Sequence, residues 1–453
     1  MTKDLTIAAF RFGYGLPLPK DSPTHPGAML SALDREIASE AYYPRLSMEM
    51  LLPLMQQADE ALKTARRSTM DAAETARESY RSFVQEIEKA ALDAAKIRFA
   101  RAIDPAMGLQ ERLVWFWADH FTTRARTRRD AALPSALVDE AIRPHVTGRF
   151  ADMLKAVMQH PAMLIYLDQS ASIGPNSRIG QRRGKGLNEN LARELLELHT
   201  LGTGYDQTDV TEMAKLLTGL VFGKEGTDFD PRRHEPGAET VQGRDYAGDD
   251  LASIHAAFED LAISPLTAQH LAKKLAVHFV SATPDPELIA EMDLAWRSSG
   301  GDLMAITQAL VSHPASWGAN QGKIRQPFDF MVAALRGLGF GPQDLMHMED
   351  RAFKRHILTP LSAMGQPWQA PAGPDGWPET ASHWITPEAM AARITWAMDA
   401  PQRLVKTLPA PLEFAKAVLD QNLTEPLTDA ILRAPSPREA IGLIIASPAF
   451  NRR

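Results

Sequence analysis

The sequence predicts a mainly α-helical protein, folded as a single large multi-helical domain with a long projecting helical arm and at most a small β-hairpin. No Gly or Pro occurs between Pro53 and Pro105, and in two later segments the apolar residues recur at spacings of three and four, as on one helix face. Alternating β-branched runs, which would indicate strands, are scarce. We expect an N-terminal helical segment over residues 1–52, the arm over 53–105 and a helical body over 106–453.

The composition excludes several classes of function. Of the 453 residues, 45% are hydrophobic and 23% are charged, which is typical of a folded globular protein. The 49 basic and 56 acidic side chains give a formal charge of −7, which argues against nucleic-acid binding as the main activity. The sequence has no Cys, so disulfides, thiolate catalysis and Cys-ligated metals are excluded.

The N-terminus does not have the pattern of a signal peptide. Its longest apolar run, Leu5 to Phe10, is too short for a signal-peptide core. No stretch approaches the roughly 18–20 apolar residues that span a bilayer. The sequence therefore predicts a cytoplasmic protein with no transmembrane segment.

Good helix formers dominate the predicted arm, which indicates one very long helix or a helical hairpin. Its apolar positions are sparse between Ala72 and Ala76 and richer between Phe83 and Ile97, so we expect the tip to project from the body. Strand pairing is most expected in the Gly-, Asp- and Pro-rich stretch Lys224–Asp250, where Thr240-Val-Gln-Gly could turn a small hairpin.

A predicted helix from Leu109 to Arg124 carries His120 on its apolar face, together with Leu113, Phe116, Trp117 and Phe121. A histidine in such a position is either a hydrogen-bonded core residue or a ligand or base for chemistry. Both interpretations are open from the sequence.

The densest group of polar residues lies where a basic loop meets a helix. The loop Gln169–Gly186 has no acidic residue and contains Arg178, Arg182, Arg183 and Lys185. It leads into the predicted helix Asn188–His199, which ends near Gly202 and Gly204. Helix N-termini favour negative charge, so this junction could bind an anion. A solvated loop is the alternative.

On a helical wheel, Asn190, Arg193, Glu194 and Glu197 share one face of that helix, and His199 lies on the opposite, leucine-rich face. Glu189, Arg193 and Glu197 could form a surface salt-bridge ladder. Alternatively, Glu194 and Glu197 could face a pocket and share protons or a metal, with Arg193 holding a carboxylate ionised.

This helix alone cannot supply a metal site that contains both His and Glu. Other segments would have to contribute His120, Asp168 or His234, the last with its neighbour Glu235. The cofactor is therefore open, and a divalent metal held by His and carboxylates is one possibility. Trp368, Trp377 and Trp384 could form an aromatic binding rim or pack a proline-rich loop.

Several of these segments resemble a bacterial family catalogued as domain of unknown function 1800. The resemblance rests on Arg112–Phe121, Pro161–Asp168, Asn188–Gly202, Tyr205–Val210, Leu217–Gly219, Lys323–Pro327 and Met364–Trp377. Family members usually carry a second His two residues before His120, where this chain has Ala118, which puts a metal at that place in doubt. The resemblance implies no reaction. It implies a protein partner encoded nearby, because members are often encoded beside a family whose proteins tend to carry twin-arginine export signals. It also implies that the chain could be exported together with that partner, as piggyback export.

The first functional hypothesis is an enzyme, a hydrolase or transferase acting on a polar or anionic substrate. Its expected catalytic residues are Glu194, Glu197, His199 and His120, and its expected substrate-binding residues are Asn188, Asn190, Arg193, Asp168, His234 and Arg182. The second hypothesis is a non-catalytic scaffold for a neighbouring exported protein, with the arm as its docking surface. The reaction, the substrate and the oligomeric state are left open.

Overall fold

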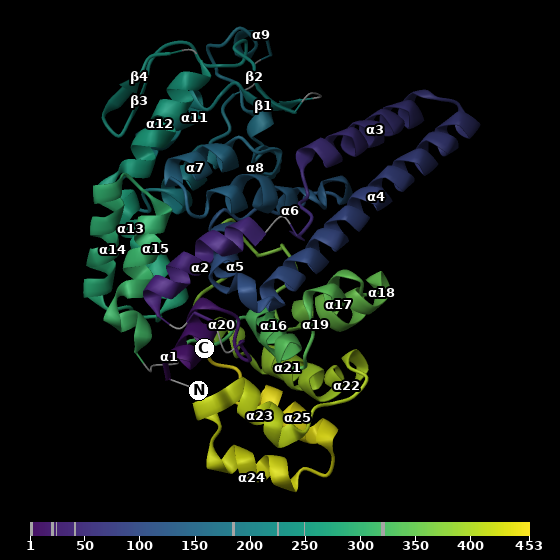
Figure 1. Ribbon diagram of the computed structural model, residues 1–453. Helices are drawn as coiled ribbons and strands as arrows, with labels where there is room; N and C mark the ends of the chain where they lie inside the picture. Colours follow the sequence, from purple (N-terminus) through teal and green to yellow (C-terminus); the bar gives the residue numbers. More distant parts are fainter. Residues whose placement is uncertain are drawn as a thin grey trace.

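The helix α5 (Gly108–His120) lies at the centre of the computed structural model, with the other elements packed around it (Figure 1). Every residue from Leu109 to Trp117 is buried, and this stretch contributes to both large apolar clusters of the core. A helix enclosed in this way has no solvent face for its polar residues, which must find partners inside the protein. The candidate site lies at its C-terminal end.

The structure describes residues 3–19, 22–23, 25–39, 42–183, 186–223, 226–248, 250–318 and 322–453. Over these residues it is mainly α-helical, with two small two-stranded sheets, so the predicted fold class is confirmed. None of the helices found there is both long and apolar enough to cross a membrane.

The arm is an antiparallel pair of helices, α3 (Met48–Arg67) and α4 (Met70–Ile103), whose outer ends project from the body (Figure 1). The connection between them is exposed, and Met70 keeps 89% of its surface accessible. In its first half α4 buries little more than Ala73 and Ala76, whereas from Leu92 onward it packs into the core. The change follows the apolar pattern of the sequence, because only side chains with apolar surface gain by burial.

Helices from three parts of the chain surround α5. The N-terminal ones are α1 (Lys3–Ile7), η1 (Ala8–Phe12) and α2 (Pro26–Ser39). The middle ones are η3 (Pro105–Met107), η4 (Arg128–Asp130), α6 (Leu133–Leu137), η5 (Val138–Ile142), η6 (Arg143–His145), α7 (Phe150–Met158), α8 (Pro161–Tyr166), η7 (Gln169–Ala171), α9 (Gly180–Arg183), α10 (Asn190–Glu194), η8 (Leu195–His199), α11 (Gln207–Leu216), α12 (Leu251–Ile263), α13 (Pro265–Phe279), α14 (Pro286–Ser299), α15 (Leu303–Ser312) and η9 (Pro314–Trp317). The C-terminal ones are α16 (Pro327–Gly337), α17 (Pro342–Met346), α18 (Asp350–Phe353), η10 (Lys354–Leu358), α19 (Thr359–Ala363), α20 (Ala381–Trp384), α21 (Pro387–Asp399), α22 (Pro401–Leu404), α23 (Pro411–Leu419), η11 (Asp420–Asn422), α24 (Glu425–Arg433) and α25 (Pro437–Ala446).

Two hairpins lie at one end of the molecule (Figure 1). The expected one pairs β3 (Glu239–Val241) with β4 (Arg244–Tyr246), and its turn residues Gln242 and Gly243 have φ angles of 51° and 73°. Positive φ at both central residues is the geometry that suits a two-residue hairpin turn. A second hairpin, β1 (Leu220–Gly223) with β2 (Gly226–Phe229), was not predicted. Its connecting residues 224–225 lie outside the described part of the chain.

Candidate functional site

A cavity of about 370 Å³ opens beside the C-terminal end of α5. Its walls come from α5, from α13 and from the loop before α20. Within the described part of the chain it is lined by Phe116, Asp119, His120, His270, Lys273, Lys274, Val277, Asp375, Trp377, Pro378 and Glu379. Titratable groups from three distant segments therefore converge on one space large enough for a small ligand.

His120 is held in one orientation and one tautomer. Its Nε2 lies 3.2 Å from the carbonyl oxygen of His199, which can only accept, so Nε2 carries the hydrogen. The Lys274 ammonium lies 3.0 Å from the other nitrogen, Nδ1, and donates to it. Burial and the nearby Lys274 charge keep the pKa of His120 well below its ordinary value. The ring is therefore neutral at physiological pH.

Asp119 is positioned by a close approach of the loop before α20. The Trp377 N–H donates to Asp119 Oδ1 at 2.8 Å. Gly376 has a φ angle of 79°, and a Cβ there would lie 2.6 Å from the Asp119 carbonyl oxygen, so only glycine fits. Burial raises the pKa of Asp119 to about 8, against the lowering effect of the Trp377 N–H. The carboxyl group therefore holds its proton near neutral pH.

Glu379, on the same wall, is held in the opposite protonation state. His278 Nδ1 and Lys323 Nζ each donate to one of its carboxylate oxygens at 2.5 Å. Arg112, which can only donate, lies 3.2 Å from His278 Nε2, so the hydrogen of that ring is on Nδ1 and points at Glu379. Burial opposes ionisation, but His278 and Lys323 outweigh it and lower the pKa of Glu379.

Lys274 lies between these groups. Burial lowers its pKa, and the nearby carboxyl groups of Asp119, Glu379 and Asp375 oppose that effect. A protonated acid, an ionised carboxylate and a part-buried amine thus share one cavity wall. Neighbouring carboxyl groups with opposite pKa shifts are typical of acid–base sites.

Residues 8–452 match the family model described as "Protein of unknown function (DUF1800)". The chain belongs to the DUF1800 family. No curated protein and no solved structure gives a significant match. The resemblance inferred from the sequence is thereby confirmed, and the DUF1800 match extends over nearly the whole chain.

The structure of this DUF1800 protein brings together two of the residues expected at the site. The ring centroids of His120 and His199 are 5.5 Å apart. His199 is 1% exposed and its Nδ1 has no hydrogen-bond partner among the described residues. Burial and the charge of Lys274 lower the pKa of His199 to about 3. It therefore contributes a neutral ring and a carbonyl acceptor for His120, and it does not line the cavity.

The two expected catalytic glutamates lie near enough for the charge of one to act on the other, but neither lines the cavity. Glu194 is part-buried, and burial together with the charge of Glu197 raises its pKa. Glu197 is exposed and its carboxylate hydrogen-bonds Tyr205. Glu194 is the last residue of α10, and at Leu195 the helix changes into the wider π-helical turn η8, which carries Glu197.

Arg193 and Glu189 form the first step of the expected surface ladder. Arg193 donates to Glu189 at 3.1 Å, and it also donates to Gln207 at 3.0 Å. Glu189 further accepts from Thr211. The partners of Glu189 are thus on α11 as well as on its own helix, and this group joins α10 to α11 on the surface.

The other expected binding residues do not line the cavity. The Asn188 amide donates to the carbonyl oxygens of Leu167 and Asp168 at 2.9 and 3.0 Å, and it thereby fixes the start of α10. Asp168 pairs with Arg126, and buried His234 donates to the Thr218 carbonyl at 2.8 Å. Asn190 and Arg182 are exposed. Of the other basic loop residues, Lys185 and the side chain of Arg183 lie outside the described part of the structure.

Three residues of the cavity, Asp119, Lys274 and Glu379, are not among those predicted from the sequence. A signal for one wall was present, because His270, Lys274 and His278 follow one another at steps of four and share a face of α13. Asp119 immediately precedes His120 within a segment that carried the family resemblance. No local pattern singles out Glu379, whose partners lie 56 and 101 residues away.

The side chains of this DUF1800 protein do not fit a metal at His120. Both His120 nitrogens have partners, and one of these is the Lys274 ammonium, which would repel a cation. Ala118 offers no ligand, and no group of three or more His, Asp or Glu among the described residues is placed to hold a metal ion. We therefore derive no chemistry from a metal at this place.

Proposed function

We propose that this protein is an enzyme, a hydrolase or transferase that acts on a small polar or anionic substrate in the cavity beside α5. The observation that carries the proposal is the Asp119 carboxyl group, whose pKa is raised to about 8 on the wall of the cavity. A protonated carboxylic acid at neutral pH can donate its proton to a leaving group, as a general acid must.

The charge of the cavity wall favours an anionic group on the substrate. Asp119 is neutral in its protonated form, and Glu379 is compensated by Lys323. With Lys274 protonated, Lys273 and Lys274 then leave one more positive charge than Asp375 balances. Lys274 is the better ligand for an anion, because it is held in place by His120 whereas Lys273 is exposed.

Three residues expected from the sequence keep roles in this proposal. His120 positions the Lys274 ammonium, and His199 positions His120 through its backbone carbonyl. Glu194 lies close enough to Asp375 to feel its charge, as Asp119 does, and Asp375 contributes to raising the pKa of both. Glu194 is therefore included in the proposal as a second carboxyl group with a raised pKa, beside the cavity and not on its wall.

The test combines a direct titration with an activity screen. In protein labelled with ¹³C at Asp carboxyl groups, we expect one carboxyl resonance to titrate near pH 8 and to vanish in Asp119→Asn. Wild type is also screened on phenyl acetate and phenyl phosphate, whose poor leaving group departs more easily when it is protonated. Any hydrolysis should be lost in Asp119→Asn and kept in Asp429→Asn, which changes an exposed carboxylate on α24. An Asp119 that titrates near its ordinary pKa contradicts the proposal.

One observation favours the scaffold as a second proposal. The arm extends beyond the body and presents Met70 at its tip with 89% of its surface exposed (Figure 1). A helical hairpin that projects from the body leaves helix surface free to pack against a protein partner. A partner encoded nearby, with which the chain would be exported, remains part of this second proposal.

A further inference from the structure

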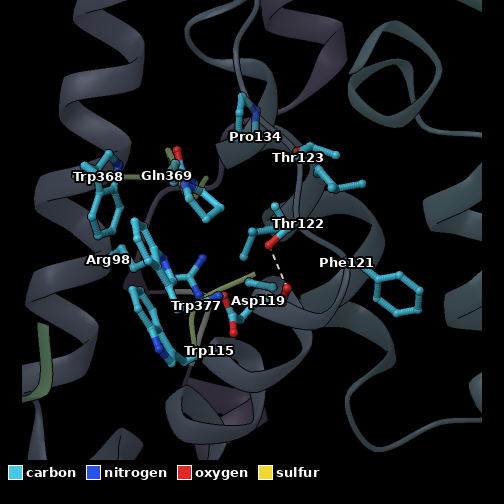
Figure 2. Close-up of a pocket in the computed structure, with 14 residues that line it drawn as sticks. Arg98, Trp115, Asp119, Phe121, Thr122, Thr123, Pro134, Trp368, Gln369 and Trp377 are labelled. Carbon is cyan, nitrogen blue, oxygen red and sulfur yellow. Dashed lines mark hydrogen bonds between the residues drawn. The ribbon is translucent and has the colours of Figure 1, made fainter. Parts of the chain in front are cut away.

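A second, smaller cavity lies on the other side of Asp119. It measures about 50 Å³, several times the roughly 10–15 Å³ that a single water requires. Its walls include Arg98, Trp115, Trp368 and Trp377, and Figure 2 shows Arg98 beside the three tryptophan rings. Asp119 and Trp377 border this cavity and the larger one. It has room for a small group such as a carboxylate and excludes larger ligands.

Arg98 is a buried cation without a carboxylate partner among the described residues. It is 6% exposed, and its contacts are the Trp115 ring, 5.1 Å from the guanidinium carbon, and the Val114 carbonyl oxygen at the long distance of 3.5 Å. The closest acidic influence is Glu111, which pairs with Arg143. Burial lowers the pKa of Arg98 to about 10, so the charge persists at neutral pH. An isolated buried charge costs stability unless a counter-charge accompanies it.

Two further hydrogen-bond donors on the same walls lack acceptors. The Trp368 Nε1–H and the Thr123 hydroxyl are buried and have no partner among the described residues. Buried donors in native proteins are nearly always satisfied, by protein, by water or by a ligand. Three residues that carry donors without good acceptors therefore border one small cavity, and among them Arg98 carries the charge that an anion would compensate.

We propose that this cavity is a binding site for a small carboxylate anion, with the Arg98 guanidinium as its main ligand. The planar guanidinium fork matches a carboxylate in two parallel hydrogen bonds. The flat rings of Trp115, Trp368 and Trp377 also line the cavity, and a flat ring face suits a planar group better than a tetrahedral one. This site goes beyond the proposed acid–base function, because its occupation requires no reaction.

The test is a titration with sodium acetate at constant ionic strength, monitored by calorimetry and by tryptophan fluorescence. Wild type should bind acetate saturably and prefer it to inorganic phosphate. Arg98→Met should weaken binding by tenfold or more, and Arg128→Met, which removes an exposed arginine paired with Glu88, should not. Absence of saturable acetate binding, equal binding of phosphate, or unchanged binding in Arg98→Met would each overturn the proposal.

A merely structural role for Arg98 is distinguished by the thermal melt without acetate. If Arg98 awaits an anion, Arg98→Met removes an uncompensated charge, and its melting temperature should equal or exceed that of wild type. A lower melting temperature together with unchanged acetate stabilisation would overturn the proposal. Should Arg98→Met fail to fold, Thr123→Val removes a single donor. It should then weaken acetate binding several-fold, and unchanged binding in that variant counts against the site.

Discussion

Asp119→Asn is expected to stabilise the protein and, under the proposed acid–base function, to remove its activity. The raised pKa means that the folded protein holds the Asp119 proton more tightly than the unfolded chain does. The resulting stability is fully present below about pH 3.8, the ordinary value, and is lost progressively as the pH rises to about 8. Asn keeps an oxygen for the Trp377 N–H and cannot ionise in either state, so the variant avoids this loss.

The size of the effect follows from the interval between the two pKa values. At pH 7 the pH is roughly three units above the ordinary pKa of Asp, so the carboxyl group is ionised in the unfolded chain, whereas it is protonated in the folded protein. At about 1.4 kcal/mol per pKa unit, wild type loses about 4 kcal/mol of stability over this interval, as an upper bound. At pH 4 the difference between Asp119→Asn and wild type should nearly vanish. A residue whose removal raises stability and abolishes activity is one retained for function.

Urea unfolding at whole pH values from 4 to 8 measures this difference. We expect the free energy of unfolding of Asp119→Asn to exceed that of wild type by an amount that grows over the series. The control Asp429→Asn, at an exposed carboxylate, should show no such growth. A difference between Asp119→Asn and wild type that is constant with pH, or that has the opposite slope, would refute the protonated acid at this position.

Three further predictions concern other parts of the structure. Lys274→Met should raise the pKa of His120, since the Lys274 charge helps to lower it, and NMR titration of the histidine rings measures the change; an unaltered His120 would disprove the contact. Arg143→Met should destabilise the protein by about 3–5 kcal/mol, because it leaves the buried Glu111 carboxylate unpaired, and adding Glu111→Leu should recover most of the loss in a thermal melt. Deleting residues 60–79, which shortens the arm, should leave the melting temperature of the body nearly unchanged. If the scaffold proposal is right, the deletion abolishes co-purification with the partner. An unaltered pull-down counts against the scaffold proposal.

Part of the site could be predicted from the sequence, and part could not. The helical spacing around His120 correctly placed this residue on a buried face, and the wheel correctly placed His199 in the core. The same wheel put Glu194 and Glu197 on one face, and the charge of Glu197 does act on Glu194, but the wheel assumed a regular α-helix and did not predict the π-helical turn η8. The π-helical turn is stabilised where the Thr200 hydroxyl donates to the Leu195 carbonyl at 2.6 Å, and no periodicity in the sequence signals such a local hydrogen bond.

The sequence by itself determined the mainly helical fold, the arm and the Gln242–Gly243 hairpin turn, and the DUF1800 family. The helices, the arm and the hairpin turn depend on the conformational preferences of residues a few positions apart. These preferences are the same wherever the segment lies in the folded protein. Only the tertiary structure decided the chemistry of the cavity. Asp119 meets Trp377 across 258 residues, and His120 meets Lys274 across 154. Protonation states depend on burial and on nearby charges, and both arise only after these distant segments have packed together.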